Sequence, residues 1–461
     1  MSPVDPPSPA RLLQDAASRS IRYLETLNDR PVRPDPAATR ALRGELGGPL
    51  PAGPSDDATV LEVLDRAASP ATMAMAGRRF FGFVIGGSLP VTLAARWLAD
   101  AWDQNTGLWE PTPATSALED IALGWLNELF GLPRTTAAGF VTGATVANFT
   151  ALAAARHAVL ARAGWNVEAD GLFGAPPIQV VIGEEAHPTL IKSLGLLGLG
   201  RTRVVRVPVD GQGRMRAEAL PQLSGPAIVC AQAGNVNTGA FDPLEAIADR
   251  LAGSGAWLHV DGAFGLWAAA SPALSPLTRG IARADSLAID AHKWLNVPYD
   301  CGIAFTRDGA ALRAAMAITA EYLPTEGGER NPSDYTPELS RRARGVEVWA
   351  ALRGLGRSGV AELIERSCRQ AQQFARGLSN AGFEVLNDVV LNQVLVAFGD
   401  AEVTRRTIAA IQAEGTCWCG ATVWQGRTAM RISLCSWATT DDDVDRSLAA
   451  IIRTARATAA P

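Results

Sequence analysis

Short apolar runs alternate with stretches of helical periodicity between residues 90 and 310, and this alternation constrains the fold more than any other feature of the chain. The apolar runs cover residues 178–181, 204–207, 227–231, 257–260, 286–289 and 302–305. Helical periodicity covers residues 88–103, 116–130, 145–163 and 187–198. Because parallel strands are joined by helical crossovers, the pattern predicts an α/β fold whose mainly parallel sheet is covered on both faces.

A second unit is expected beyond residue 341. Its helical stretches cover residues 342–355, 359–380, 402–414 and 441–455. These stretches flank strand-like runs at 392–398 and 429–434, which indicates a smaller α+β domain.

The two remaining segments have a different character. The first 50 residues hold one helical stretch, 10–27, followed by Pro- and Gly-rich sequence, which is typical of an arm that packs on another surface. Residues 320–340 are polar and without period, which favours a mobile lid. The expected units are 1–87, 88–318, 319–341 and 342–461.

Composition argues against several classes of partner. The net charge of −5 and the pI near 5.6 provide no basic field for nucleic acid. The chain starts without a cationic segment followed by an apolar core, and no later apolar run has membrane-spanning length. The six cysteines are scattered, and Cys417-Trp418-Cys419 lacks a second pair that would complete a zinc site. We therefore expect a cytoplasmic protein without a metal, a nucleic acid or a membrane partner.

Only two of the 42 Lys and Arg residues are lysine, Lys192 and Lys293. Lys293 follows the apolar run 286–289 and precedes Pro298, so it lies on a loop that leaves a probable buried strand. A desolvated lysine amine loses its proton and attacks carbonyl groups, whereas arginine stays protonated. The pattern indicates Schiff-base chemistry, with genomic drift toward arginine and a simple ion pair as the alternative.

Further motifs lie at the same predicted sheet edge. Asp261 ends the run 257–260, where it either keeps a pyridine nitrogen protonated or caps the next turn. Residues 143–145 start a helix whose free amides bind phosphate, unless they only cap it. His187 and His292 follow strands and are placed to stack on a planar cofactor. The other two histidines, His157 and His259, are interpreted as structural.

Together these blocks resemble the pyridoxal-phosphate-dependent group II amino-acid decarboxylases. The resemblance covers about residues 70–355 and continues more weakly into residues 431–434. It implies the aspartate-aminotransferase fold (fold type I), with a large, mostly parallel seven-stranded sheet domain and a smaller C-terminal α+β domain. The matching motifs are Arg79-Phe80-Phe81-Gly82, Thr112-Pro113-Ala114, Leu118-Glu119, Gly143, Ala186-His187, Gly239-Ala240-Phe241-Asp242-Pro243-Leu244, His259-Val260-Asp261, Ala284-Asp285-Ser286, His292-Lys293-Trp294-Leu295 and Asp300-Cys301-Gly302.

The resemblance also implies pyridoxal 5'-phosphate as cofactor and a role for each matching residue. Lys293 would bind the cofactor covalently, Asp261 would pair with the pyridine nitrogen, and His187 and Ala263 would pack on opposite faces of the ring. Further cofactor contacts are implied for Gly143, Ala144, Thr145, Asn235, Asp290 and His292.

A catalytic loop and a dimer follow from the same resemblance. Tyr322, in segment 319–341, matches the tyrosine that protonates the carbanion after CO2 leaves. Because this loop acts across a dimer interface in relatives, the chain is expected to be a homodimer with its active site near the interface. Residues 1–87 would be the arm that packs in the dimer, and 88–318 the cofactor-binding domain.

The substrate is less constrained. Val146 replaces an acid of the family, and Asn235-Val236 and Gly262 with Phe264 are further departures near the cofactor. The residues that match the side-chain pocket favour an aromatic or bulky apolar L-amino acid; they are Phe83, Val84, Gly86, Gly107 and Trp109. An acidic substrate would need an arginine, for which the candidates are Arg78, Arg79, Arg341, Arg342 and Arg344. A diamino substrate is a third alternative.

The resemblance is compatible with several reactions. Retention of Tyr322 and His187 favours decarboxylation to an amine and CO2. An aldehyde synthase is the nearest alternative, and a transaminase on the same fold would need no tyrosine-bearing lid. A protein that binds the cofactor for regulation, without catalysis, is the most distant alternative.

Overall fold

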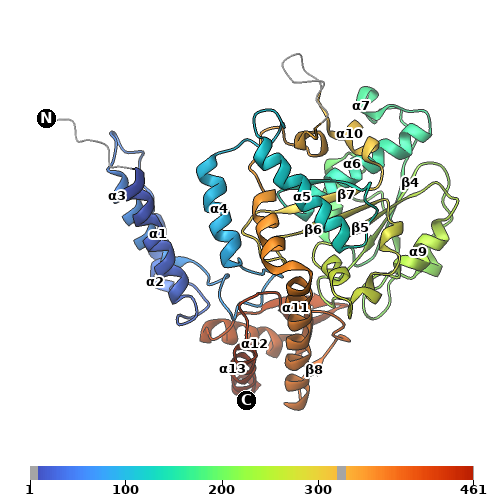
Figure 1. Ribbon diagram of the computed structural model, residues 1–461. Helices are drawn as coiled ribbons and strands as arrows, with labels where there is room; N and C mark the ends of the chain where they lie inside the picture. Colours follow the sequence, from blue (N-terminus) through green and yellow to red (C-terminus); the bar gives the residue numbers. More distant parts are fainter. Residues whose placement is uncertain (1–8, 319–328, 460–461) are drawn as a thin grey trace, which may run out of the picture.

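The computed structural model describes residues 9–318 and 329–459. Its large sheet has the strand order β1-β7-β6-β5-β4-β2-β3 (Figure 1). The strands are β1 (Ala137–Val141), β2 (Gln179–Gly183), β3 (Val205–Val207), β4 (Ala227–Gln232), β5 (Trp257–Asp261), β6 (Ser286–Asp290) and β7 (Gly302–Thr306). Strands β2 to β6 pair in parallel, whereas β7 pairs antiparallel with β1 and β6. The six predicted strands are confirmed, and β1 is a strand that the apolar runs did not reveal.

Alternate side chains of the strands fill a separate core on each face of the sheet. On β4, Ile228 and Cys230 face one core, and Val229 and Ala231 face the other. The first core includes α6 (Ala144–Arg162), α8 (Pro188–Leu196) and α10 (Gly309–Met316). The second core includes α5 (Pro113–Leu129), α9 (Leu244–Leu251) and the start of α11 (Gly345–Asn380). Helices therefore cover both faces, as the alternating pattern predicts.

The remaining elements of this region are short or peripheral. They are α4 (Pro90–Trp102), α7 (Val167–Asp170) and the 3-10 helices Ser69–Ala71, Ala217–Ala219, Gly265–Ala270, Ser275–Thr278, Ile281–Arg283 and Pro332–Tyr335. Within residues 9–318 and 329–459, no helix combines the length and the apolar character that a membrane crossing requires.

A four-stranded antiparallel sheet forms the C-terminal unit, in the order β10-β11-β9-β8. Its elements are β8 (Glu384–Val385), β9 (Gln393–Ala397), β10 (Gly420–Trp424), β11 (Arg427–Ser433), α12 (Ala401–Glu414) and α13 (Asp441–Ala459). Helix α11 links this unit to the large sheet. It consists of two helices that meet at a kink at Gly356, whose φ of 60° breaks the helical geometry. The prediction of two helices, at 342–355 and 359–380, is thereby confirmed.

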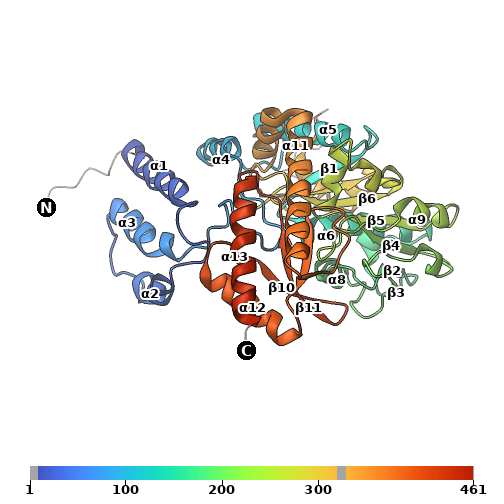
Figure 2. The same ribbon diagram turned by 90° about the horizontal axis from the view of Figure 1, so that it is seen from below.

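Three N-terminal helices, α1 (Pro9–Thr26), α2 (Pro36–Leu46) and α3 (Asp57–Ala68), stand to one side of the large sheet (Figures 1 and 2). The prediction of a single helix in the first 50 residues is wrong, because Asp35 caps α2 and Pro36 starts it within the Pro-rich segment. Neither α1 nor α2 buries a residue in the single chain.

Candidate active site

A cavity of about 280 Å³ lies where β5 and β6 end and α6 begins. Its lining residues are Thr142, Gly143, Ala144, Thr145, His187, Thr189, Gln232, Gly234, Val236, Asp261, Ala263, Phe264, Asp290, His292 and Lys293. The structure thus brings together all of the predicted cofactor residues except Asn235. Tyr322 lies outside the described residues.

Lys293 is anchored by the carboxylate at the end of β6. Its Nζ lies 3.0 Å from Asp290 Oδ2, and the Ala144 N–H donates to Asp290 Oδ1 at 2.6 Å. Asp290 therefore joins the lysine to the N-terminus of α6, where the partial positive charge of the helix favours an anion. The sequence predicted each of these residues at the edge but did not predict their contacts.

Asp261 ends β5 and is 3% exposed. Its Oδ2 accepts from Asn148 Nδ2 at 3.2 Å, and its Oδ1 accepts from the Ala263 N–H at 3.2 Å. A buried carboxylate with two fixed N–H donors keeps one orientation, which is the geometry needed to pair with a cationic ring nitrogen.

His187 caps the start of α8 and lines the cavity. Its Nδ1 accepts from the Thr189 N–H at 3.3 Å and lies 2.6 Å from Thr189 Oγ1. Burial lowers the pKa of His187. The neutral ring therefore carries its proton on Nε2, because Nδ1 is used as an acceptor.

His292 is held in the same tautomer by a different donor. Its Nδ1 accepts from the Cys301 N–H at 3.0 Å, and burial lowers the pKa of the ring. Its Nε2 lies 3.6 Å from Asp290 Oδ1, and Tyr299 stacks on its face with ring centroids 4.3 Å apart. His292 thus closes the side of the cavity next to Lys293.

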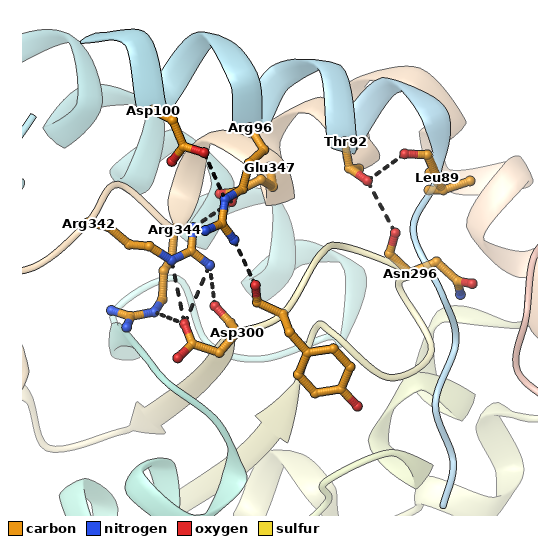
Figure 3. A network of polar contacts seen from close by, with 10 residues as sticks. Leu89, Thr92, Arg96, Asp100, Asn296, Asp300, Arg342, Arg344 and Glu347 are labelled. Atoms are coloured by element: carbon orange, nitrogen blue, oxygen red, sulfur yellow. Dashed lines mark hydrogen bonds and ion pairs between the residues drawn. The ribbon is translucent and has the colours of Figure 1, made fainter. Parts of the chain in front are cut away.

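The loop that follows Lys293 is tied to α4 and to the start of α11 (Figure 3). From α4, the Thr92 hydroxyl donates to the Asn296 carbonyl at 3.3 Å, and Arg96 Nη1 donates to the Tyr299 carbonyl at 2.7 Å. Ahead of α11, Arg344 Nε donates to Asp300 Oδ1 at 3.0 Å. These contacts hold the lysine-bearing loop against the scaffold, which limits the positions that Nζ can take.

Comparison with known proteins identifies the family. The model of the pyridoxal-dependent decarboxylase conserved domain matches residues 54–399. The chain belongs to this family. An L-2,4-diaminobutyrate decarboxylase of Rhizobium meliloti is 32% identical over 79% of this chain and 75% of its own length. An aromatic-L-amino-acid decarboxylase of Bacillus atrophaeus is 28% identical over 83% of this chain and 80% of its own length.

Solved structures agree in fold. The Oryza sativa tryptophan decarboxylase crystallised with pyridoxal phosphate and tryptamine superposes with a TM-score of 0.90 over 99% of both chains, at 24% identity. The predicted fold class, the pyridoxal phosphate cofactor and the assignment as a carboxy-lyase are thereby confirmed.

The residues of the cavity fit this cofactor. A lysine amine, a buried carboxylate at a strand end and the start of α6 supply the groups that bind an aldehyde, a ring nitrogen and a phosphate. The Ala144 N–H is taken by Asp290, and the following amides of the first turn have no acceptor within the helix. A Cβ at Gly143 would lie 3.1 Å from His292 Cε1, so a larger side chain would close this end of the cavity.

Asn235 differs from the other predicted cofactor residues. Its Oδ1 accepts from the N–H groups of Asn237 and Thr238, and its Nδ2 donates to Gln232 Oε1 at 3.3 Å. These bonds close a turn behind the cavity wall. In this chain, Asn235 therefore supports the lining residue Gln232 and is not itself exposed to the cavity.

None of the five residues predicted for the substrate pocket is among the described residues that line the cavity. Val84 is buried, and Phe83 is 58% exposed and packs on Trp418 in a tilted arrangement with ring centroids 5.2 Å apart. A Cβ at Gly86 would lie 2.0 Å from the Lys293 carbonyl oxygen, so this segment packs directly on the lysine-bearing loop. Gly107 packs in the same way on the Leu339 carbonyl.

Three residues in or near the cavity were not predicted from the sequence: Thr189, Gln232 and Arg431. Thr189 follows His187 by two residues, which is a readable signal for a hydroxyl that orients an imidazole. Arg431, on β11, is close enough to contribute to the lowered pKa of His187, and burial lowers the pKa of its own guanidinium. Within the described residues no carboxylate lies within 4 Å of Arg431, whereas the other cation near the cavity, Lys293, has Asp290.

Proposed function

We propose that this carboxy-lyase converts an L-amino acid with an aromatic side chain into the corresponding amine and CO2. The convergence of Lys293, Asp261 and His187 on one cavity supports this function. When bound, pyridoxal phosphate supplies the ring that accepts the electron pair left by the departing CO2.

Each residue of the cavity has its own role in the proposed reaction. Lys293 binds the cofactor through Nζ, and Asp290 Oδ2 is placed to accept the proton that this ammonium must lose. Asp261 holds a proton on the ring nitrogen through the orientation that Asn148 and Ala263 fix. His187 offers its Nε2 proton as a donor.

Arg431 is the cation assigned to the substrate carboxylate. It is desolvated, and no described carboxylate neutralises it. A bound carboxylate would therefore replace lost hydration at little further cost. Tyr322 is assigned, from its position in the sequence, as the group that then delivers a proton to Cα.

The contacts of the candidate arginines argue against an acidic side chain. Arg341 is fully buried and pairs with Glu119 at 2.8 Å, and Arg79 pairs with Asp443 at 3.1 Å. Arg342 and Arg344 both pair with Asp300. Of the five, only Arg78 is exposed, and none of the five is among the described residues that line the cavity. Phe264 and Val236, which line the cavity, favour a neutral, aromatic side chain.

We also infer that two copies of the chain form a dimer through the N-terminal helices. Leu13, Ile21 and Leu24 of α1 and Val60 and Leu64 of α3 are all at least 38% exposed. On α4, Val91, Trp97, Leu98 and Trp102 are at least 42% exposed. An apolar surface of this extent on several helices is typical of a protein interface. A hollow of about 550 Å³ among α1 to α3 contains none of the predicted catalytic residues, which fits a packing role for this unit.

The test supplies the cofactor-loaded protein separately with L-tryptophan, L-tyrosine, L-glutamate and L-2,4-diaminobutyrate, and quantifies CO2, amine, aldehyde and hydrogen peroxide. Equal amounts of amine and CO2 from an aromatic substrate are expected. Turnover of glutamate or diaminobutyrate alone would refute the substrate class, and aldehyde with peroxide would assign the chain to the oxidative reaction instead.

A further inference from the structure

A chain of hydrogen bonds runs behind Asp261, on the side away from the cavity. Trp257, His259 and Asp261 alternate along β5, so they share one face of the sheet. Trp257 Nε1 donates to Ser286 Oγ at 2.8 Å, and Ser286 Oγ lies 2.9 Å from His259 Nδ1. His259 Nε2 lies 2.8 Å from Asn148 Oδ1, and Asn148 Nδ2 donates to Asp261.

The direction of this hydrogen-bond chain is fixed from the Asp261 end. A carboxylate can only accept, so the Asn148 amide nitrogen donates to Asp261 and the Asn148 Oδ1 accepts from His259 Nε2. The neutral His259 ring then has a lone pair on Nδ1, which accepts the Ser286 hydroxyl proton. The Trp257 indole N–H, which can only donate, takes a lone pair of Ser286 Oγ. Any reversal would point a lone pair of Asn148 at the carboxylate.

The chain is also isolated from water. Asn148 and His259 are 0% exposed, and Trp257 and Ser286 are 1% exposed. Burial lowers the pKa of His259 to about 3, so the ring stays neutral at physiological pH. Hydrogen bonds within such a dry cluster polarise one another, and a misplaced donor is costly.

We propose that Asn148, His259 and Ser286 are positioning residues for the reaction, which hold the Asp261 carboxylate in one orientation toward the cofactor ring. They touch neither cofactor nor substrate and act only through Asp261. Trp257 holds the Ser286 hydroxyl in place by donating to it. This inference rests on the role of Asp261 in the proposed function and replaces the structural interpretation of His259.

A cluster that only stabilises the fold predicts a different result from a cluster that positions Asp261. If the cluster only stabilises the fold, a substitution in it lowers protein stability and leaves the bound cofactor unchanged. If the cluster positions Asp261, the same substitution also changes the visible absorption of the cofactor, the pH dependence of that absorption and kcat, because the partner of the ring nitrogen moves.

The substitution Ser286→Ala breaks the hydrogen-bond chain behind Asp261, and Ser367→Ala is the control substitution. Ser367 is equally buried and accepts an indole N–H from Trp294 at 3.3 Å, but it has no bond to the chain behind Asp261. For Ser286→Ala we expect kcat and cofactor affinity to fall about 10-fold to 100-fold, as for other groups that orient a ligand-binding residue. KM is expected to stay constant, and Ser286→Thr should restore the wild-type values.

Two outcomes overturn the proposal. One is a Ser286→Ala protein that is less stable but keeps the absorption spectrum, cofactor affinity and kcat of the wild type. The other comes from the cofactor-free protein labelled with ¹⁵N at its four histidines. In that protein, a proton on Nδ1 of His259 would contradict the direction of the chain. If Ser286→Ala does not fold, Asn148→Leu on α6 takes its place with the same expected effects.

The proposed function fails separately from this inference. If the wild type releases no CO2 from any amino acid, decarboxylation is refuted. The His259 tautomer and the effect of Ser286→Ala on cofactor affinity would still show whether the hydrogen-bond chain positions Asp261.

Discussion

Glu119→Gln is expected to destabilise the protein strongly, because Glu119 neutralises a fully buried arginine. Glu119 and Arg341 are both 0% exposed and lie 2.8 Å apart, and Arg330 donates to the other Glu119 oxygen at 3.2 Å. Breaking a buried pair by removing one charge costs about 3–5 kcal/mol. Arg341 keeps its bonds to the Thr106 and Phe140 carbonyls, so a cost near the lower end, about 3 kcal/mol, is expected.

Denaturation by urea measures this cost through the midpoint of unfolding of each variant. Glu128→Gln on the same helix is the control, because Glu128 pairs with Arg357 at the surface and should contribute less than about 1 kcal/mol. Replacing both partners, as Glu119→Leu with Arg341→Met, leaves no uncompensated charge at Arg341. The double variant should therefore be more stable than either single variant. Additive losses, or a Glu119→Gln midpoint equal to that of Glu128→Gln, would refute the reasoning.

Four further predictions concern the site, the pH response and the assembly. Lys293→Ala should abolish both the visible absorption of the bound cofactor and CO2 release; an unchanged spectrum would contradict the role of Lys293. Tyr322→Phe should keep the cofactor but shift the product from amine toward aldehyde, measured by chromatography, and unaltered amine yield would exclude Tyr322 as the proton donor. Because the pKa of His259 is about 3 in the fold and near 6.5 when unfolded, its contribution to stability is complete above pH 6.5. That contribution is lost as the pH falls toward 3, at about 1.4 kcal/mol per pH unit; His259→Gln should reduce this slope in urea titrations between pH 6.5 and 5, and an equal slope would count against it. Leu13→Glu, at a position 66% exposed on α1, should give monomers by analytical ultracentrifugation, whereas Leu50→Glu, 94% exposed outside the helices, should not.

Elements that show an apolar or periodic pattern within their own segment were predicted from the sequence. Strands that are defined mainly by pairing with another strand were missed. Strands β4 and β5 are continuous apolar runs because both of their faces are buried, and this pattern is visible without the fold. Strand β1 begins with three small residues, which give no clear apolar run. It is recognised as a strand through its antiparallel pairing with β7. Strand β10 lies at the edge of the small sheet and pairs antiparallel with β11, and its side chains at 421 and 423 are exposed. Helix α2 was missed because its proline and glycine content resembled a loop.

The same distinction applies to the candidate site. Lys293, Asp261 and His187 stand in motifs whose order along the chain places them at one sheet edge, so their convergence could be predicted. Asn148 lies in a predicted helix, but which end of its amide meets Asp261 is decided by the carboxylate, which can only accept, and by His259 on the other side of the amide. No local pattern carries that information.

The arginines support the proposed substrate class. Arg341 is a candidate from the sequence, but it lies beside Glu119 on α5, where its charge is neutralised within the scaffold. Arg431, which was not predicted as a site residue, lies on β11 of the small sheet, and the described part of the chain provides no carboxylate for it. Burying a cation without its anion is costly unless a ligand supplies one. Arg431 is enough for the α-carboxylate that every amino acid carries. Among the described residues, the buried and half-buried candidate arginines are already paired with carboxylates; they are Arg79, Arg341, Arg342 and Arg344. This charge balance supports the proposed neutral side chain over an acidic one.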